Sequence, residues 1–270
     1  MRRRKVEPTP PLMLADVQAP EQVDSLQRGL EILRLFDGRH PLLSQAEIAS
    51  RLDLSRATAA KLLSTLVAFG FLREDAGGSY EPHAACLALG RAVKRGLPVV
   101  QTATPLMTQF AEQFGVHVSL MTRDRSQMLV LEYCVPGGQD TLGLGAGALV
   151  PIASSASGRA YLWAQKPALQ AELIDGLKQA GQEGAHRFMP GVYAAFQELE
   201  ETGFCYLASP VTRHSNSIAA PLYDKGSPDY VLAAMAVGAS DAERKLREEV
   251  GPQLLQVSAQ ISRELERLPL

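Results

Sequence analysis

The chain has 270 residues, of which 46% are hydrophobic and 21% charged, and its formal net charge at pH 7 is −2. These values are typical of a globular protein with two domains, and they exclude an intrinsically disordered chain. No apolar run approaches the ~18 residues of a membrane helix. The apolar part of the N-terminus, "PLMLA", is too short for a secretory signal. Three scattered cysteines without a C-x-x-C pair favour a reducing cytoplasm over a disulfide framework or a zinc site. We therefore expect a cytoplasmic protein.

The charge is distributed unevenly along the chain. Residues 1–97 hold 14 Lys and Arg against 11 Asp and Glu, whereas the rest of the chain holds 13 against 18. The first residues, Arg2 to Lys5, are all basic, and we expect residues 1–22 to form a disordered basic tail. A modest basic excess near the N-terminus is the distribution expected of a nucleic-acid-binding segment. The basic tail would add salt-sensitive affinity for the nucleic acid.

The first predicted elements are two helices. "SLQRGLEILRLF" can be capped by Asp24 or Ser25, and it has an apolar side formed by Leu26, Leu30, Leu33 and Phe36. "LSQAEIASRLD" predicts a second, short helix that begins with a capping box, because Glu47 follows Ser44 by three residues.

A third helix, "SRATAAKLLSTLVAFG", follows after a tight turn. Ser55 is a good N-cap and Gly70 suits the C-terminus. One side is apolar (Ala59, Leu62, Leu63, Leu66 and Phe69), whereas the other holds small or basic residues (Arg56, Ala57, Ala60, Lys61 and Ser64). Basic side chains suit phosphates and guanine edges, and small ones let a backbone approach DNA closely. Taken alone, the same pattern also fits an ordinary solvated helix face.

The neighbours of this helix favour DNA reading. Two helices joined by so short a turn fit a helix-turn-helix, and "FLREDAGGSYEPH" then predicts a hairpin in the position of a wing. We therefore predict a winged helix-turn-helix at residues 23–83. The alternative is that this fold serves only protein contacts, which would need no basic residues on the outer face of the third helix.

The remaining two thirds of the chain predict an α+β domain at residues 98–270, preceded by a linker helix at 84–97 with Leu87, Leu89, Val93 and Leu97 along one side. Apolar, β-branched runs predict two strands within 116–135 and three more between 203 and 237. Helices are expected from Ala156, near 167–180 and 190–202, and as one long helix at 240–267. We expect a mixed or antiparallel sheet with its helices on one side.

Nothing in this domain favours catalysis. His117, His186 and His214 are scattered, and neither Cys134 nor Cys205 has the flanking residues of a nucleophile. The chain contains no G-x-S-x-G, no GxxxxGK[ST] and no His/Asp/Glu group with metal-ligand spacing. We expect no catalytic residue, no metal and no cofactor. The histidines are interpreted as structural and the two thiols as buried and inert.

Several segments, in a fixed order, resemble one family. "SLQRGLEILRLF", "LSQAEIASRLDLSRATAAKLLSTLVAFGFL" and "YEPHAACLALG" resemble the N-terminal domain of the IclR family of bacterial transcriptional regulators. "GALVPIASSASGRAYLWA" and "SNSIAAPLYDKGSPDYVLAAMAVG" resemble segments of its effector-binding domain. The resemblance covers the chain from about Val23 to Leu268. It departs at Ala57, where a serine is common, and at Ala60, where a larger residue is usual. It implies a winged helix-turn-helix joined by a linker helix to a GAF-like, profilin-like domain.

The resemblance and the helix pattern together identify candidate site residues. The candidates for DNA binding are Ser55, Arg56, Ala57, Thr58, Ala60, Lys61 and Ser64 on the third helix, with Arg73 and Ser79 on the wing. The candidates for effector binding, by their match to the family's pocket segments, are Leu142, Leu144, Val150, Ala156, Ser157 and Ser217. The amides at the N-terminus of the helix from Ala156 would suit the carboxylate of a small, aliphatic or aromatic acid.

The hypothesis is a ligand-responsive, sequence-specific transcriptional regulator of a catabolic or metabolic operon, which binds a roughly palindromic operator as a homodimer or homotetramer. Two alternatives stay open. One is a small-molecule enzyme or sensor whose winged domain serves only assembly. The other is a ligand-insensitive architectural DNA-binding protein. The sequence leaves open the effector, the operator, and whether the protein activates or represses.

Overall fold

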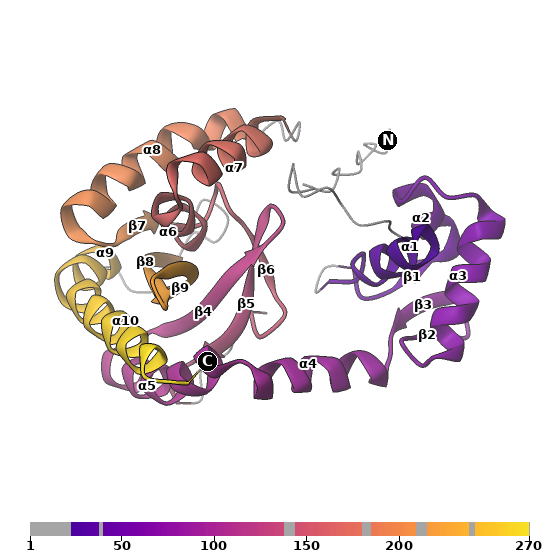
Figure 1. Cartoon of the computed structure of the whole chain (residues 1–270), viewed down its shortest axis with the longest axis horizontal. Helices are drawn as coiled ribbons and strands as arrows, with labels where there is room; N and C mark the ends of the chain where they lie inside the picture. Colours follow the sequence, from indigo (N-terminus) through magenta and orange to yellow (C-terminus); the bar gives the residue numbers. More distant parts are fainter. Residues whose placement is uncertain are drawn as a thin grey trace. The chain divides into compact units, whose positions relative to one another are not determined.

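In the computed structural model, the described residues are 23–37, 40–137, 144–179, 185–208, 215–237 and 241–269. They form two compact units, which divide between Lys94 and Arg95 (Figure 1). The predicted tail at residues 1–22 and the candidate residue Leu142 lie outside the described residues. Each unit has a sheet and a core of its own.

The N-terminal unit is a winged helix-turn-helix, as predicted. Three helices and two hairpin strands follow in the expected order. A short strand before the second helix adds a third strand to the sheet, which is antiparallel with the order β1-β3-β2. This short strand was not predicted from the sequence. The elements are α1 (Asp24–Leu33), β1 (Leu43–Ser44), α2 (Gln45–Arg51), α3 (Arg56–Ala68), β2 (Leu72–Glu74), β3 (Ser79–Pro82) and α4 (Ala84–Gly96).

The core of this unit differs in part from the predicted apolar faces. It is centred on Ile32, Leu43, Ile48, Leu63, Leu72 and Tyr80. Helix α1 faces this core with Ile32, so the predicted core residues Leu26 and Leu30 are 62% and 53% exposed. The N-cap of α1 is Val23, which makes no side-chain hydrogen bond, instead of the predicted Asp24 or Ser25. Phe69, at the end of α3, is 74% exposed. A helical repeat locates an apolar side, but the neighbouring elements decide which of its residues are covered.

Helix α4 coincides with the predicted linker helix, but its apolar side chains are not covered. No residue of α4 is buried, and Leu87, Leu89 and Val93 are all more than half exposed. The next helix, α5 (Pro98–Phe114), begins after Leu97, which provides no side-chain cap. Pro98 at the first helical position suits this start because a proline lacks only an amide that would be unpaired there.

The C-terminal unit is built on a six-stranded antiparallel sheet with the order β6-β5-β4-β9-β8-β7. The α+β prediction is therefore confirmed, and the open choice between a mixed and an antiparallel sheet is resolved. The strands are β4 (His117–Asp124), β5 (Gln127–Cys134), β6 (Leu149–Pro151), β7 (Cys205–Ala208), β8 (Ser215–Asp224) and β9 (Ser227–Val237).

Helices pack on both faces of this sheet, so the expectation that they lie on one side was wrong (Figure 1). One face packs against α5 and the C-terminal helical segments. The other packs against α6 (Ala156–Ala164), α7 (Pro167–Gln179) and α8 (Ala185–Thr202). Strands of a sheet covered on both faces are buried throughout, which explains the nearly continuous apolar runs in β8 and β9.

The predicted C-terminal helix at 240–267 is interrupted by a π-helical segment. It consists of α9 (Ala242–Arg244), the π-helix η1 (Lys245–Val250) and α10 (Gly251–Glu266). A Cβ on Gly251 would lie 2.3 Å from the ring of Phe204. Only glycine allows the helix to approach this ring so closely. Single-turn π-helical segments inside α-helices are frequently found at functional sites.

Candidate functional site

Side-chain hydrogen bonds fix the turn before α3. Ser44 and Glu47 form the predicted capping box at the start of α2, and the hydrogen bonds from Ser44 lower the pKa of the Glu47 carboxyl group. The Ser55 hydroxyl accepts the amide of Thr58 at 3.1 Å and caps α3. The Gln45 side-chain amide donates to the Arg56 carbonyl at 2.9 Å. These contacts hold the first turn of α3 against α2.

The outer side of α3 is exposed over its whole length. Ala59 and Leu63 are buried against the core, whereas all five residues of the predicted outer face are exposed: Arg56, Ala57, Ala60, Lys61 and Ser64. Thr58 lies at the edge of this face, where its hydroxyl is 2.8 Å from that of Ser55. The structure therefore brings the predicted α3 residues together on one accessible surface of small and basic side chains.

The hairpin β2–β3 has its own polar contacts. The Asp75 carboxylate accepts the amides of Gly77 and Ser79 at 2.9 and 2.8 Å and stabilises the turn, in which Gly78 has a φ of +78°. The Arg73 Nε is 2.6 Å from the Glu81 carboxylate on the paired strand. Arg73 and Ser79 are thus on the wing as predicted. The Arg73 guanidinium, however, is already engaged by a carboxylate that would compete with a phosphate.

In the C-terminal unit, α6 starts as the sequence predicted, but its cap is Ser155, which the prediction did not name. The Ser155 hydroxyl accepts the Gly158 amide at 3.1 Å and donates to the Pro151 carbonyl at 2.7 Å. Ala156 and Ser157 are only 2% and 4% exposed. A Cβ on Gly158 would lie 2.2 Å from a backbone oxygen of the preceding loop, so glycine allows the helix to start against this loop.

The start of α6 lies over the sheet. The Cys205 thiol, on β7, donates to the Ala156 carbonyl at 3.4 Å. Ser217, near the start of β8, faces the α6 side, since its neighbour Ile218 packs into the core on the α5 side. Of the predicted apolar wall, Val150 packs against the α6-side core and Leu144 is half-buried. The structure therefore brings Ala156, Val150 and Ser217 to the same side of the sheet, while Leu142 lies outside the described residues.

Three further polar residues lie on this side of the sheet and were missed as candidates. His117 and Ser119, on β4, are 3% and 6% exposed. The His117 Nδ1 is 2.8 Å from the Tyr133 hydroxyl on β5, and Ser119 is paired directly with Tyr133. We call His117, Ser119, Tyr133 and Ser217 the polar sheet patch.

The strand register places Ser119 and Tyr133 on the same face as the start of α6, but three and four strands away from Cys205. One row across the sheet joins Cys205, Ala219, Ala233, Ser119 and Tyr133, and Cys205 is the residue that contacts Ala156. The next row contains His117 and Ser217 with Met235 between them. The sequence did contain a signal for the patch. In "VHVSL" the polar residues alternate with apolar ones, although the strand is buried on both faces.

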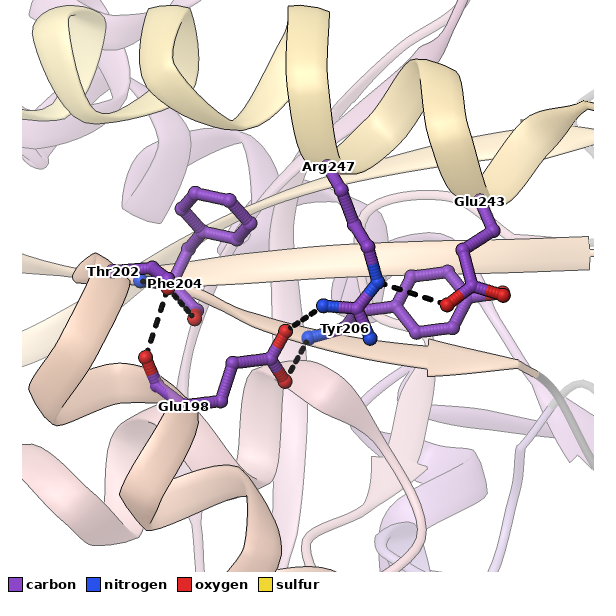
Figure 2. Close-up of polar contacts among 6 residues, drawn as sticks. All are labelled: Glu198, Thr202, Phe204, Tyr206, Glu243 and Arg247. Carbon is purple, nitrogen blue, oxygen red and sulfur yellow. Dashed lines mark hydrogen bonds and ion pairs between the residues drawn. The ribbon is translucent and has the colours of Figure 1, made fainter.

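A polar network holds the edge strand β7 between α8 and the π-helix (Figure 2). The Glu198 carboxylate accepts the Tyr206 amide at 3.0 Å and pairs with the Arg247 guanidinium. The Arg247 Nε also lies 2.9 Å from Glu243, and its guanidinium stacks 4.4 Å from the centre of the Tyr206 ring. The network positions β7, which is the partner of the strand that holds Ser217.

The chemistry of the described residues does not favour catalysis. Burial raises the pKa of the Cys205 thiol to about 12, so it stays protonated and unreactive at neutral pH. Within the described ranges, no group of His, Cys, Asp and Glu side chains could hold a metal ion. Among the described helices, none is long and apolar enough to cross a membrane.

A winged helix-turn-helix followed by an α+β domain of this architecture defines a class of transcriptional regulators. Residues 25–76 match the IclR helix-turn-helix domain, and residues 91–263 match the C-terminal domain of the bacterial transcriptional regulator IclR. The chain belongs to the IclR family, as the sequence resemblance predicted. The helix-turn-helix domain supports DNA binding.

Curated relatives align over nearly the whole chain. The chain is 30% identical to the HTH-type transcriptional regulator TsaQ1/TsaQ2 of Comamonas testosteroni, over 94% of this chain and 95% of that protein. It is 25% identical to the Pca regulon regulatory protein of Pseudomonas putida, over 91% and 84% of the two chains. These relatives are regulators and not enzymes, in agreement with the prediction.

Solved structures share the fold. An IclR family transcriptional regulator from Brucella abortus superposes with a TM-score of 0.84 at 30% identity, over 95% of this chain and 97% of that one. An IclR homolog from Microbacterium hydrocarbonoxydans, solved as a complex with 4-hydroxybenzoate, superposes with a TM-score of 0.70 at 18% identity, over 90% of this chain and 100% of that one.

Proposed function

We propose that this protein is a ligand-responsive, sequence-specific regulator of a catabolic or metabolic operon. The observation on which this proposal chiefly rests is the exposed outer face of α3, which presents Arg56 and Lys61 among small residues inside a winged helix-turn-helix. In this fold, the second helix of the motif enters the major groove, where basic side chains reach guanine edges and phosphates.

The other candidate residues would surround this contact. Arg56 and Lys61 bind base edges or phosphates, and Ser55 and Thr58 bind phosphates at the start of the helix. Ala57, Ala60 and Ser64 line the side of α3 that faces the groove, where small side chains permit close approach. On the wing, Arg73 and Ser79 contact the DNA backbone or the minor groove. The contribution of Arg73 is reduced by its ion pair with Glu81.

In this proposal the protein self-associates, and a symmetric homodimer would bind a palindromic operator. Large apolar side chains on α1 and α4 are left exposed within a single chain: Leu26, Leu30, Leu87, Leu89 and Val93. Such surfaces are typical of protein interfaces. A homodimer would present two copies of α3 to half-sites about one helical turn apart, and pairing of dimers would give a tetramer.

The effector in this proposal is a small organic acid. The first amides of α6, at Ala156 and Ser157, lie beside the sheet, where the helix dipole favours a carboxylate. Val150, Leu142 and Leu144 would form apolar walls, and Ser217 a polar group on the facing strand. The complex of the Microbacterium homolog with 4-hydroxybenzoate is consistent with this ligand class. The effector binds two arrangements of the dimer with different affinity, and α4 transmits the change of arrangement to the DNA-binding domain.

DNA binding by a paired variant tests the proposal. Arg56→Ala together with Lys61→Ala should weaken binding to DNA from upstream of the protein's own gene by at least about 30-fold, because each removes a base or phosphate contact. The control Lys166→Ala with Arg267→Ala also removes two exposed positive charges, but from the C-terminal unit. Fluorescence anisotropy at two salt concentrations, against scrambled DNA, is the measurement. Equal affinity of both variants for the upstream DNA would contradict the assignment of α3.

The same assay distinguishes the alternatives. Upstream DNA bound no better than scrambled DNA would favour a winged domain used only for assembly, in a small-molecule sensor. Specific binding that no small acid changes would favour a ligand-insensitive architectural protein. The proposal requires specific, salt-dependent binding that a small acid shifts.

A further inference from the structure

The wing has a single basic side chain among several acidic ones. In residues 71–83, Arg73 is the only Lys or Arg, whereas Glu74, Asp75 and Glu81 carry carboxylates. The phosphates of DNA attract basic groups and repel acidic ones, so a wing that only binds the DNA backbone is expected to be basic. The charge of this hairpin is therefore the opposite of what backbone binding alone requires.

Two of the three carboxylates have roles inside the hairpin. The Asp75 carboxylate accepts the amides of the turn. Glu74 lies beside Tyr80, whose pKa is raised first by burial and then by this carboxylate. Within the described residues, the Glu81 side chain pairs with Arg73 alone. Glu81 is therefore the carboxylate that acts directly on the one cation of the wing.

The strand register fixes this pair. Arg73 and Glu81 lie opposite each other in the β2–β3 ladder, and the Arg73 Nε donates to the Glu81 carboxylate at 2.6 Å. Side chains alternate along a strand, so Ser79 and Glu81 lie on the side of β3 opposite to the buried Tyr80, and Arg73 lies opposite to the buried Leu72. A DNA backbone that reaches Arg73 and Ser79 therefore also meets the Glu81 carboxylate.

A carboxylate and a phosphate compete for the same guanidinium group. The side chains of Arg73 and Glu81 are 60% and 31% exposed, so solvent screens their ion pair and the pair can open. Once Arg73 turns to a phosphate, the unpaired Glu81 carboxylate stays near the DNA backbone, where like charges repel each other. Glu81 thus opposes the phosphate contact both before and after Arg73 is released.

We propose that Glu81 is an intramolecular competitor of DNA, which binds Arg73 in the free protein and limits the affinity of the wing for the phosphate backbone. Phosphate contacts carry no sequence information, so this contact lowers the affinity for all DNA and leaves the reading of bases to α3. The inference rests on the proposed function, in which the wing approaches DNA. It adds the residue that sets the strength of this approach.

A substitution that removes only the negative charge tests the inference. Glu81→Gln keeps the size of the side chain and should strengthen binding about three- to tenfold, to upstream and to scrambled DNA alike, because Arg73 becomes available to a phosphate. The logarithm of the affinity should also fall more steeply with the logarithm of the salt concentration, by about one unit of slope, because one more phosphate is neutralised. Fluorescence anisotropy on the full-length protein over a series of salt concentrations measures both effects.

A double-mutant cycle isolates the role of Arg73. In a protein that already contains Arg73→Gln, the change Glu81→Gln should strengthen binding by less than about twofold, because only a screened repulsion is then removed. An equal gain with and without Arg73 would show a general effect of charge and would overturn the inference. Unchanged or weaker binding by Glu81→Gln alone would overturn it as well.

The control variant is Glu74→Gln in the same hairpin. It removes the same charge from the residue next to Arg73, but Glu74 is paired in the ladder with Tyr80 and not with the arginine. Binding should change by less than about twofold, and the salt dependence should stay that of the native protein. A gain as large as that of Glu81→Gln would contradict the competition between Glu81 and DNA.

Failure of the inference and failure of the proposed function give different results. Specific binding that depends on Arg56 and Lys61, without a gain in Glu81→Gln, would overturn only the role of Glu81. Upstream DNA bound no better than scrambled DNA would contradict the proposed function, and the affinity of Glu81→Gln for scrambled DNA would still decide whether Glu81 competes with phosphates.

Discussion

The two faces of the C-terminal sheet are both covered by helices, but they differ in composition. The face toward α5 and α10 is lined by apolar residues such as Val118, Leu120 and Leu232, which pack into one continuous core. The face toward α6 also has an apolar core, but it contains the polar sheet patch as well.

On the proposed function, which assigns Ser217 to the effector site, the difference separates what the sheet needs for stability from what it uses for recognition. An apolar, closely packed face contributes most of the folding free energy per residue. Polar groups on the second face lower that contribution, and ligand-binding sites commonly accept this cost. Substitutions on the first face should therefore change stability, and those in the polar sheet patch should change binding.

The largest effect is expected at the contact that seats α6 on the second face. Gly158→Ala introduces a Cβ within 2.2 Å of the backbone at Ile152, which cannot move as a flexible side chain would. We expect a loss of at least about 3 kcal/mol, at the upper end for overpacking. Urea unfolding followed by the fluorescence of Trp163, the only tryptophan and a residue of α6, reports on this unit. Gly145→Ala, with nothing within 4 Å, is the matched control and should be nearly neutral.

A large effect is also expected on the apolar face. Leu120 is fully buried there, and Leu120→Ala should cost about 2–5 kcal/mol through lost burial and a cavity. The same unfolding experiment measures this cost. The affinity for a bound acid should stay within about threefold of the native value where folding is intact, as expected for a residue that contributes packing only. A fall in affinity as large as that of a polar-patch variant would contradict the division between the two faces.

A smaller effect is expected from the network around the edge strand. Arg247→Met keeps much of the volume but removes the ion pairs to Glu198 and Glu243. Because the Arg247 side chain is 39% exposed, solvent screens these pairs and the loss should be about 1 kcal/mol. Arg244→Met, which removes a more exposed set of ion pairs on the same helical segment, is the control and should cost less. Equal losses of stability in the two variants would show that the contacts of Arg247 to β7 do not stabilise the fold.

The smallest change in stability is expected in the polar sheet patch. Ser119→Ala removes one hydroxyl from a residue that is 6% exposed and leaves its backbone pairing in place, so stability should change by less than about 0.5 kcal/mol. Urea unfolding measures this change, and calorimetry with a small acid measures the affinity. A large loss of stability with unchanged binding would reverse the assignment of the two faces.

The sequence was informative where structure depends on neighbours in the chain. The capping box at Ser44 and Glu47, the hairpin around Gly78 and the start of α6 at Ala156 were all predicted, because caps and turns are decided by residues a few positions apart. The outer face of α3 was predicted for the same reason, since one helix orders its own side chains. The IclR resemblance then supplied the order of the domains.

Long-range packing could not be predicted in the same way. The periodicity of α4 marked Leu87 and Val93 as an apolar side, but whether anything covers them is decided by distant elements, and they are exposed. The need for a glycine at Gly251 comes from the ring of Phe204, which is far away in the sequence. His117 was interpreted as a structural residue because the histidines are scattered in the sequence, and its contact with Tyr133 on another strand could not be predicted.

The sequence by itself determined the class of the protein, the winged helix-turn-helix and the exposed basic face of α3, since each follows from local patterns or from motifs in a fixed order. Only the tertiary structure decided that helices cover both faces of the sheet and that Ser119 and Tyr133 meet on the face toward α6. The physical reason is strand pairing. A register between distant segments selects which buried side chains share a face, and no single segment contains that information.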